Sequence, residues 1–443
     1  MLKTKKLSPA LLTAAATLLA GSAMGQGLGN SPYSRLGLGD NVGNTGGVRQ
    51  LGIGSTGIAA PNSGNVNELN PALLYYTPRT TWEAGFNAQI KTVRNATASQ
   101  QVGSGTLGYL ALAVPINKRL AASAGLKPYS SVDYQATNTG PVNGDPTAVV
   151  YRRYSGDGGL SEAYLATGIH VLRDFNIGGS ASYFFGTINQ TTGRAIISPV
   201  ISAQQLVVEG ETLRYSDFLF RAAAHYRHKF SDKVNVNAGA VHTFQTRAKA
   251  GRQRTSEQQD ANGAVLAGTT TVMLNDDSGY VTVPALTQLG LSLDNNRNWS
   301  ASVDVSRQEW SKFKSFSQVS TLPLSDSWRV SAGGEFTPDP GSVEHYFQRV
   351  TYRAGLSVSQ LPYQPAGQHL YDRAVHWGFA FPLPTASALE STIISLGFAY
   401  GVRGNTNYVG GSSSDVSNVQ ENYVRMQVGA TLSNRWFIKR RLQ

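Results

Sequence analysis

The feature that most constrains this sequence is an alternation of apolar and polar residues with a period of two. A strand with one apolar and one polar face produces this pattern, because successive side chains point to opposite sides. Comparable runs occur near 394–403, 328–336, 234–245 and 120–127. In the last run one face would carry Val424, Met426, Val428, Ala430 and Leu432, and the other Arg425, Gln427, Gly429, Thr431 and Ser433. The alternation predicts an all-β protein.

The lengths of the links between the runs favour a membrane barrel over a soluble sandwich. Short links with turn residues, such as Asn117-Lys118 and Asn295-Asn296, alternate with longer segments that include 132–160, 189–211 and 250–277. We predict these longer segments as loops. Transmembrane barrels have short turns on one side, long loops on the other and an even number of strands. We count fourteen runs and predict a 14-stranded antiparallel transmembrane β-barrel, which pairs all its backbone groups by closing on itself.

The first 25 residues have the features of a secretory signal peptide. Lys3, Lys5 and Lys6 precede an apolar stretch at 7–20, and small residues Ala23 and Gly25 follow. A membrane anchor is the alternative, although the stretch is shorter than the ~20 residues of a spanning helix. The chain has no cysteine, which excludes lipoprotein anchoring, disulfides and thiolate metal sites.

The formal net charge of +11 must be interpreted together with export. A basic chain often binds nucleic acid, but an exported one meets other anions. We therefore expect outer-membrane lipid and lipopolysaccharide as neighbours and no nucleic acid. The basic stretch 439–441 could lie near a membrane surface or be a solvated tail.

Residues 52–57, Gly-Ile-Gly-Ser-Thr-Gly, match the glycine spacing of a dinucleotide-binding turn. That turn requires a following helix of ten or more residues, and Pro61 and Gly64 would interrupt one. We expect no cofactor at Gly52, Gly54 and Gly57. In a compact segment these glycines would allow close backbone approach and unusual dihedral angles.

The stretch 46–76 resembles the N-terminal region of the FadL family of outer-membrane transporters of long-chain fatty acids and other hydrophobic compounds. Residues 50–57 stand in for the family's glycine-rich part, and Asn70-Pro71-Ala72 matches its N-P-A. The resemblance implies a fourteen-stranded barrel with an N-terminal plug, or hatch, inside the lumen, in the outer membrane of a Gram-negative bacterium. The expected domains are the signal peptide at 1–25, the plug at 26–80 and the barrel at 81–443. A disordered glycine-rich leader is the alternative to a plug.

Signals for catalysis are poor. The histidines are scattered, and His225 and His228 would point to opposite faces of a strand, which argues against zinc. His242 would lie on an apolar face, but no serine is marked as its partner. We expect no enzymatic activity, no metal and no cofactor.

Basic residues on the expected inward faces are candidate contacts for an anionic headgroup. Neutralisation by Glu335, Asp304 and Glu68 is the alternative role for them. They are Arg119, Lys127, Arg329, Arg353, Arg403 and Arg425.

Pro128 lies within the third expected strand. Proline cannot donate a ladder hydrogen bond, which implies a bulge or a local opening. In the FadL family an inward kink of the third strand forms a lateral exit to the bilayer, so the resemblance implies a lateral opening near Pro128. A strand that simply ends there is the alternative.

Two functions remain open. The first is passive uptake of a hydrophobic or amphipathic compound, similar to a long-chain fatty acid, through the barrel and the lateral opening. The second is a non-transporting accessory or adaptor subunit that binds a protein partner in an outer-membrane secretion or assembly complex. The segment 250–277 is polar and mixed in charge, which favours a solvated loop over an apolar capture surface.

Overall fold

The structure is a computed structural model that describes residues 30–42, 45–198, 205–260, 263–316, 323–385, 390–409 and 418–434. The predicted signal peptide at 1–25 and the basic stretch 439–441 lie outside the described residues.

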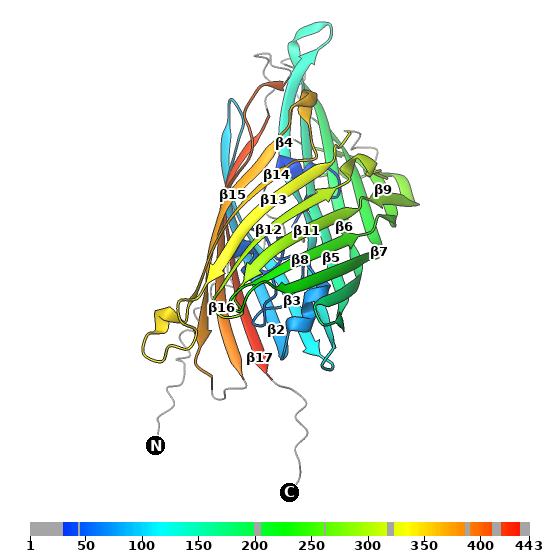
Figure 1. Ribbon diagram of the computed structural model, residues 1–443. Helices are drawn as coiled ribbons and strands as arrows, with labels where there is room; N and C mark the ends of the chain where they lie inside the picture. The colour runs from blue at the N-terminus through cyan, green and yellow to red at the C-terminus, as the bar shows by residue number, and fades with distance from the viewer. Residues whose placement is uncertain are drawn as a thin grey trace, which may run out of the picture.

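Fourteen antiparallel strand positions close into a barrel, as the alternation predicts (Figure 1). Two positions are long strands that are each interrupted once: β8 continues into β9, and β10 continues into β11. The last strand pairs with the first from Gln420–Arg94 to Asn434–Thr80, and this pairing completes the ring. The strands are β2 (Thr80–Arg94), β3 (Ser99–Pro115), β4 (Leu120–Val142), β5 (Asp145–Leu172), β6 (Phe175–Ile197), β7 (Leu206–Lys229), β8 (Asn235–Thr243), β9 (Thr246–Gln259), β10 (Thr271–Val283), β11 (Leu286–Asp294), β12 (Trp299–Gln308), β13 (Ser327–Phe336), β14 (Thr351–Gln360), β15 (Tyr371–Leu383), β16 (Ser391–Gly404) and β17 (Gln420–Asn434).

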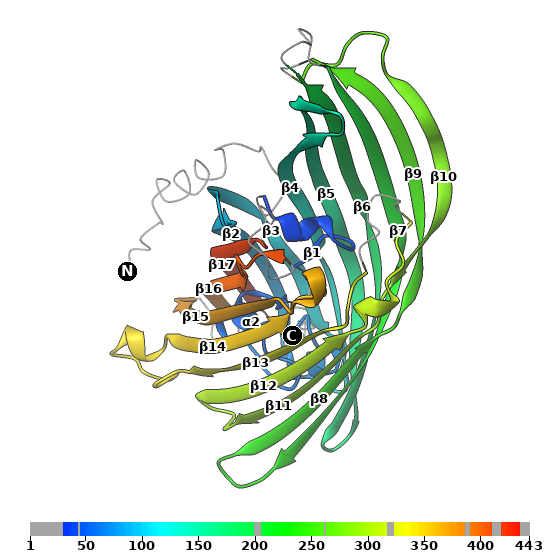
Figure 2. The same ribbon diagram turned by 90° about the horizontal axis from the view of Figure 1, so that it is seen from above.

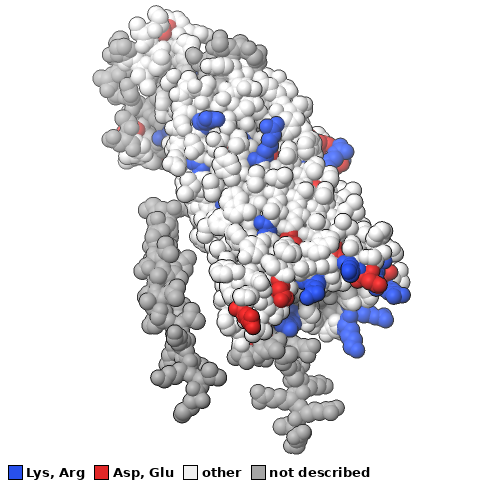
Figure 3. Space-filling model, turned by 60° about the vertical axis from the view of Figure 1, so that its left-hand side comes forward, with Lys and Arg blue, Asp and Glu red and all other residues white. Residues whose placement is uncertain are grey.

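The wall is apolar outside and largely polar inside. On β11, Leu289, Leu291 and Leu293 are 56%, 62% and 43% exposed, whereas Ser292 and Asp294 between and beside them are buried. On β17, Val424, Met426 and Leu432 are exposed, whereas Gln427, Gly429, Thr431 and Ser433 on the other face are buried. This arrangement is the reverse of a soluble protein and fits a wall surrounded by lipid. On the face in Figure 3, charged side chains gather at the lower end, and mostly uncharged residues with scattered charged ones cover the wall above.

The links differ between the two ends of the barrel. At the end that holds the start of β2 and the end of β17, called the turn end, most links are short. The link between β13 and β14 is an exception, since it runs from 337 to 350 and contains η5 (Tyr346–Gln348). The opposite end is called the hairpin end.

Three segments that the sequence predicts as loops are largely strand. β4 and β5 pair up to a tight turn at 143–144, β6 and β7 extend to Ile197 and from Leu206, and β9 and β10 cover much of 250–277. The loop prediction for 132–160, 189–211 and 250–277 is therefore wrong. Beyond the lipid both faces of a hairpin can meet water, so the backbone pairs without the alternation that marks a strand.

These extensions form a curved sheet of β4, β5, β6, β7, β9 and β10 that rises at the hairpin end, with β9 and β10 far from the centre (Figure 2). Its inner face carries the largest apolar cluster, which includes Phe184, Leu213 and Val281. Leu38 packs into this cluster, and Phe313 and Phe316 pack against it. The part of the sheet next to the barrel is thus covered on its inner side, whereas most residues of the hairpin tip at 135–147 are exposed.

Small elements precede the barrel or join its strands. The former are η1 (Pro32–Arg35), β1 (Asp40–Asn41), α2 (Val48–Gly52) and η3 (Pro71–Tyr76), and the latter include η4 (Trp310–Lys312) and η6 (Pro365–Gly367). Within the described part of the chain, no helix has the length and apolar character needed to span a membrane.

Candidate functional site: the N-terminal segment and two cavities

Residues 30–42 and 45–79, called the N-terminal segment, pack against the inner faces of the wall. α2 contacts β14, β15, β16 and β17, and η3 contacts β4, β5, β6 and β7 on the opposite side. All five residues of α2 are buried. The segment therefore crosses the interior from one wall to the other.

Arg49 of α2 ties this segment to the wall through a buried ion pair. Its guanidinium donates to both carboxylate oxygens of Glu335 on β13, with Nη2 2.7 Å from Oε1. Arg353, the register partner of Glu335 on β14, donates from Nε to Oε2 at 3.2 Å. One carboxylate thus serves two guanidinium groups, and this Arg49–Glu335–Arg353 cluster retains excess positive charge.

The glycine motif lies where the segment touches the wall most closely. Gly54 has a φ of +78°, a conformation that side chains disfavour. The N–H groups of Gly57 and Ile58 both donate to Oδ2 of Asp304 on β12, at 2.7 and 3.0 Å. On the wall, a Cβ atom at Gly333 or Gly355 would collide with the backbone of residues 53–54.

The Asn70-Pro71-Ala72 motif begins η3. The Asn70 side chain accepts from the N–H of Ala72 at 2.9 Å, and its amide donates to the carbonyl of Ile58 at 2.6 Å. Pro71 occupies the first helical position, where no N–H is needed. Ala72 is fully buried, and a Cβ atom at Gly178 of β6 would collide with it. The motif caps a helical turn and joins it to the glycine motif.

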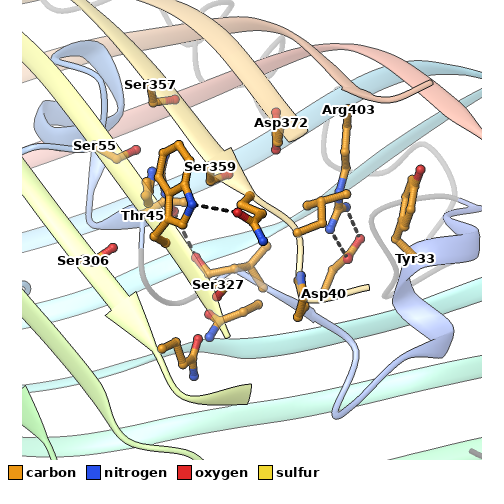
Figure 4. A pocket seen from close by; sticks show the side chains of 18 of the residues that line it. Tyr33, Asp40, Thr45, Ser55, Ser306, Ser327, Ser357, Ser359, Asp372 and Arg403 are labelled. Carbon is orange, nitrogen blue, oxygen red and sulfur yellow. Dashed lines mark hydrogen bonds and ion pairs between the residues drawn. The ribbon is translucent and has the colours of Figure 1, made fainter. Parts of the chain in front are cut away.

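A cavity of about 230 Å³ lies between the N-terminal segment and the hairpin end (Figure 4). Leu324, Leu361 and Trp310 are among its apolar lining residues. Its polar side carries hydroxyl groups from neighbouring strands, among them Ser306, Ser327, Ser331, Ser357 and Ser359. This hairpin-end cavity is therefore amphipathic.

Charged side chains line the polar side in register. One row crosses the wall through Ser306, Arg329, Ser359, Asp372, Arg403 and Glu421 as successive strand partners. Arg403 donates to both oxygens of Asp40 on β1, at 2.8 and 3.0 Å, and lies 3.7 Å from Glu421 (Figure 4). Arg329 and Arg425 form no direct ion pair among the described residues, and two carboxylates that likewise form none there, Asp304 and Asp372, line the same cavity.

A second cavity, of about 560 Å³, opens at the turn end. The N-terminal segment contributes residues 61–65 to it, whereas Ser55 and Ile58 line the hairpin-end cavity. Residues 53–60 and the Arg49–Glu335–Arg353 cluster thus lie at the division between the two cavities.

The wall has a seam between β3 and β4. These strands pair only from Leu110–Leu126 to Pro115–Ala121, although β3 continues to Ser99 and β4 to Val142. Pro128 lies two residues beyond the last pair, and the register with β5 shifts between Pro128 and Ser130.

The N-terminal segment takes the place of β3 beside this seam. β1 pairs with β4 at Ser130 and Ser131. Asn30 donates to Gln100 on β3 and to the carbonyl of Gln135 on β4, both at 3.3 Å. The first described residue therefore bridges the two edges of the seam.

Glu68 is a buried acidic residue in the N-terminal segment, and it lines neither of the two cavities. Burial raises the pKa of Glu68 to about 7, the Lys127 ammonium opposes this shift, and Glu83 and Glu162 add to it. Lys127 Nζ lies 3.6 Å from Glu68 Oε2, and both side chains are buried.

The predicted basic residues fall into separate environments. Arg403 and Lys127 are ion-paired to the N-terminal segment, and Arg353 lines the turn-end cavity. Arg329 and Arg425 line the hairpin-end cavity. Arg119 is exposed in a turn, so its predicted inward position is wrong. The expected neutralising partners Glu335 and Glu68 do form ion pairs, whereas Asp304 accepts backbone N–H groups instead.

Sequence reasoning missed Arg49 and Asp40. Each is a charged residue within an otherwise glycine-rich or apolar stretch, and this is the signal that could have identified them. Among the residues that the structure describes, no group of three His, Asp or Glu side chains is placed to hold a metal ion.

Comparison with known proteins identifies both a family and a fold. A family model described as BamG matches residues 4–443. No curated protein matches the sequence. Three solved structures share the fold. The CymD monoaromatic hydrocarbon channel and the P. putida toluene transporter TodX are each 16% identical with a TM-score of 0.53, and the matches cover 90% and 89% of this chain and 100% and 99% of those chains. A Pseudomonas aeruginosa FadL homologue is 14% identical with a TM-score of 0.56, and the match covers 89% of this chain and 98% of that chain. At these identities the likeness establishes the barrel fold.

Proposed function

We propose that this chain, which belongs to the BamG family, is an outer-membrane channel for passive uptake of a hydrophobic or amphipathic compound. Proteins with the same fold are described as a monoaromatic hydrocarbon channel and a toluene transporter, which supports a hydrophobic cargo. The observation that carries the proposal is the amphipathic hairpin-end cavity of about 230 Å³. Its volume suits a small molecule rather than a polymer.

In this proposal the cargo enters the hairpin-end cavity with its apolar part against Trp310 and Leu361. An anionic or polar headgroup meets Arg329 and Arg425, whose guanidinium groups make no direct ion pair among the described residues. Charge-assisted hydrogen bonds to a headgroup contribute more than bonds between neutral groups. The N-terminal segment acts as the plug that prevents straight passage.

The lateral opening is the proposed exit. The seam between β3 and β4 starts near Pro128, and β1 lies between the seam and Arg403. Release of Asp40 from Arg403 would allow β1 to move and join the cavity to the seam. The wall thus offers a route to the bilayer that bypasses α2.

The test is uptake of radiolabelled toluene and of octanoate by proteoliposomes. Pro128→Ala is expected to restore pairing between β3 and β4 and to slow uptake. Pro115→Ala is the matched control, because Pro115 lies in the paired part of β3 opposite Ala121. Equal uptake by the wild type and the Pro128→Ala variant would rule out the lateral route. Absence of uptake by the wild type would rule out a channel function.

The second candidate is an accessory subunit of an envelope complex. The observation that favours it is the free edge of β4 beyond Gln135, which pairs only with β5 among the described residues. An exposed strand edge can accept a strand from another protein. Purification from native membranes distinguishes the two candidates, since an adaptor should retain a stoichiometric partner.

A further inference from the structure

The turn-end cavity has a chemical character that the uptake of a hydrophobic compound does not explain. Four arginines line it, Arg227, Arg297, Arg349 and Arg353, against two carboxylates, Asp294 and Glu335. Arg227 is neutralised by Asp294, with Nη2 2.6 Å from Oδ1. Arg297 and Arg349 form no ion pair with a described residue, so the cavity has an excess of about two positive charges.

Two of these arginines also have buried N–H groups without an acceptor. Arg353 has a side chain only 3% exposed, and its Nη1 has no hydrogen-bond partner among the described residues. Nε of Arg349 is likewise buried and unpartnered. A buried donor without an acceptor is unfavourable, so a ligand oxygen that accepts from these N–H groups would be bound favourably here.

The remaining lining residues provide further donors and an aromatic surface. Asn62 and Asn298 carry side-chain amides, and Trp299 adds an indole ring. Guanidinium groups bind oxyanions through paired, parallel hydrogen bonds. An excess of two charges is best balanced by a dianion, which a phosphate monoester group approaches near neutral pH.

We propose that the turn-end cavity binds a phosphate group through Arg349 and Arg353. The phosphate would belong either to a free molecule or to a lipid headgroup that reaches the turn end. This site is independent of the proposed uptake, because it lies on the other side of the N-terminal segment from the hairpin-end cavity.

The experiment is isothermal titration of the full chain in detergent with inorganic phosphate at low ionic strength. Arg349→Gln is the informative variant, because Arg349 is only partly buried and holds no ion pair. Loss of one charge-assisted interaction should weaken phosphate binding about tenfold or more. Arg307→Gln removes an equal charge at the hairpin end, where Arg307 pairs with Asp326, and should change the affinity by less than about twofold.

A second arm identifies the source of the phosphate and guards against a folding defect. Vesicles of phosphatidic acid in phosphatidylcholine should compete with inorganic phosphate if a lipid is the ligand, and should not if the ligand is free. Arg297 is an exposed turn residue that lines the turn-end cavity, and Arg297→Gln should also weaken phosphate binding. The proposal is overturned if the wild type does not bind phosphate, or if Arg349→Gln binds it as tightly as the wild type. Uptake of toluene is unaffected by either result.

Discussion

Arg49 and Glu335 lie 286 positions apart in the sequence, yet Arg49 Nη2 lies 2.7 Å from Glu335 Oε1, and the Arg49 side chain is 1% exposed. This contact joins α2 to the wall. Among the described residues of the N-terminal segment, α2 is the only α-helix. The Arg49–Glu335 contact also lies beside the turn-end cavity, which Glu335 lines. The contact is therefore the most direct point at which to release the segment.

Replacing Glu335 with Gln should destabilise the seating of the N-terminal segment by ~3–5 kcal/mol, because it leaves two buried guanidinium groups without a carboxylate. We expect higher single-channel conductance in planar bilayers and faster proteolysis of residues 45–79. Asp326→Asn removes a carboxylate from an exposed pair and serves as the control. Unchanged conductance and proteolysis would mean that the ion pair does not hold the segment in place.

Gly333→Ala should prevent the N-terminal segment from seating. The added methyl group would collide with the Ile53 carbonyl, and backbone at this contact has little room to move. Gly103→Ala is the matched control on the same barrel, since its Cβ would meet only the Gln89 carbonyl at 3.9 Å. Refolding yield and trypsin resistance in detergent measure the difference. Equal behaviour of the two variants would contradict the close approach.

Glu68 makes stability depend on pH. Its folded-state pKa of about 7 lies above its ordinary value of 4.5, so the folded chain binds more protons between these values. The associated stability is fully present below about pH 4.5 and is lost as the pH rises through about 7. Thermal unfolding followed by the shift in gel mobility should show this loss in the wild type, and Glu68→Gln should reduce it. A pH slope that is the same in both would exclude Glu68 as its source.

Leu291→Arg tests the outward face of the wall. Leu291 is 62% exposed on β11, and an arginine facing lipid costs ~2–4 kcal/mol at the bilayer centre. Leu291→Phe keeps the apolar surface and should change stability little. Reversible unfolding in vesicles gives the two free energies of unfolding. A cost near zero for the arginine would mean that this face is not in contact with lipid.

The fold could be predicted because a barrel in lipid leaves a period-two signal on every strand that crosses the bilayer. The alternate residues from Val424 to Leu432 are a clear example, and in the structure each is more exposed than its neighbours on the strand. The extensions at 132–160 and 250–277 could not be predicted, because a strand in water on both sides carries no such signal. The predicted inward position of Arg119 is wrong because the sequence pattern does not distinguish the end of a strand from an adjoining turn residue.

The site was harder to predict than the fold. The glycines of the motif could be located, but their contacts at Asp304, Gly333 and Gly355 depend on strands more than 240 residues away. The same is true of Arg403, which pairs with Asp40 across 363 positions. Which arginines retain an unpaired charge depends on these distant partners, and no local pattern records it.

The barrel of this chain is a closed wall that turns its apolar face to lipid and its polar face inward. Spin labels at single positions from 424 to 433, in the full chain in lipid vesicles, test this directly through collision with oxygen. We predict high oxygen accessibility at Val424, Met426, Val428, Ala430 and Leu432, and low accessibility at Arg425, Gln427, Gly429, Thr431 and Ser433. Accessibility that is uniform along β17, or that peaks at the second set, would contradict the account.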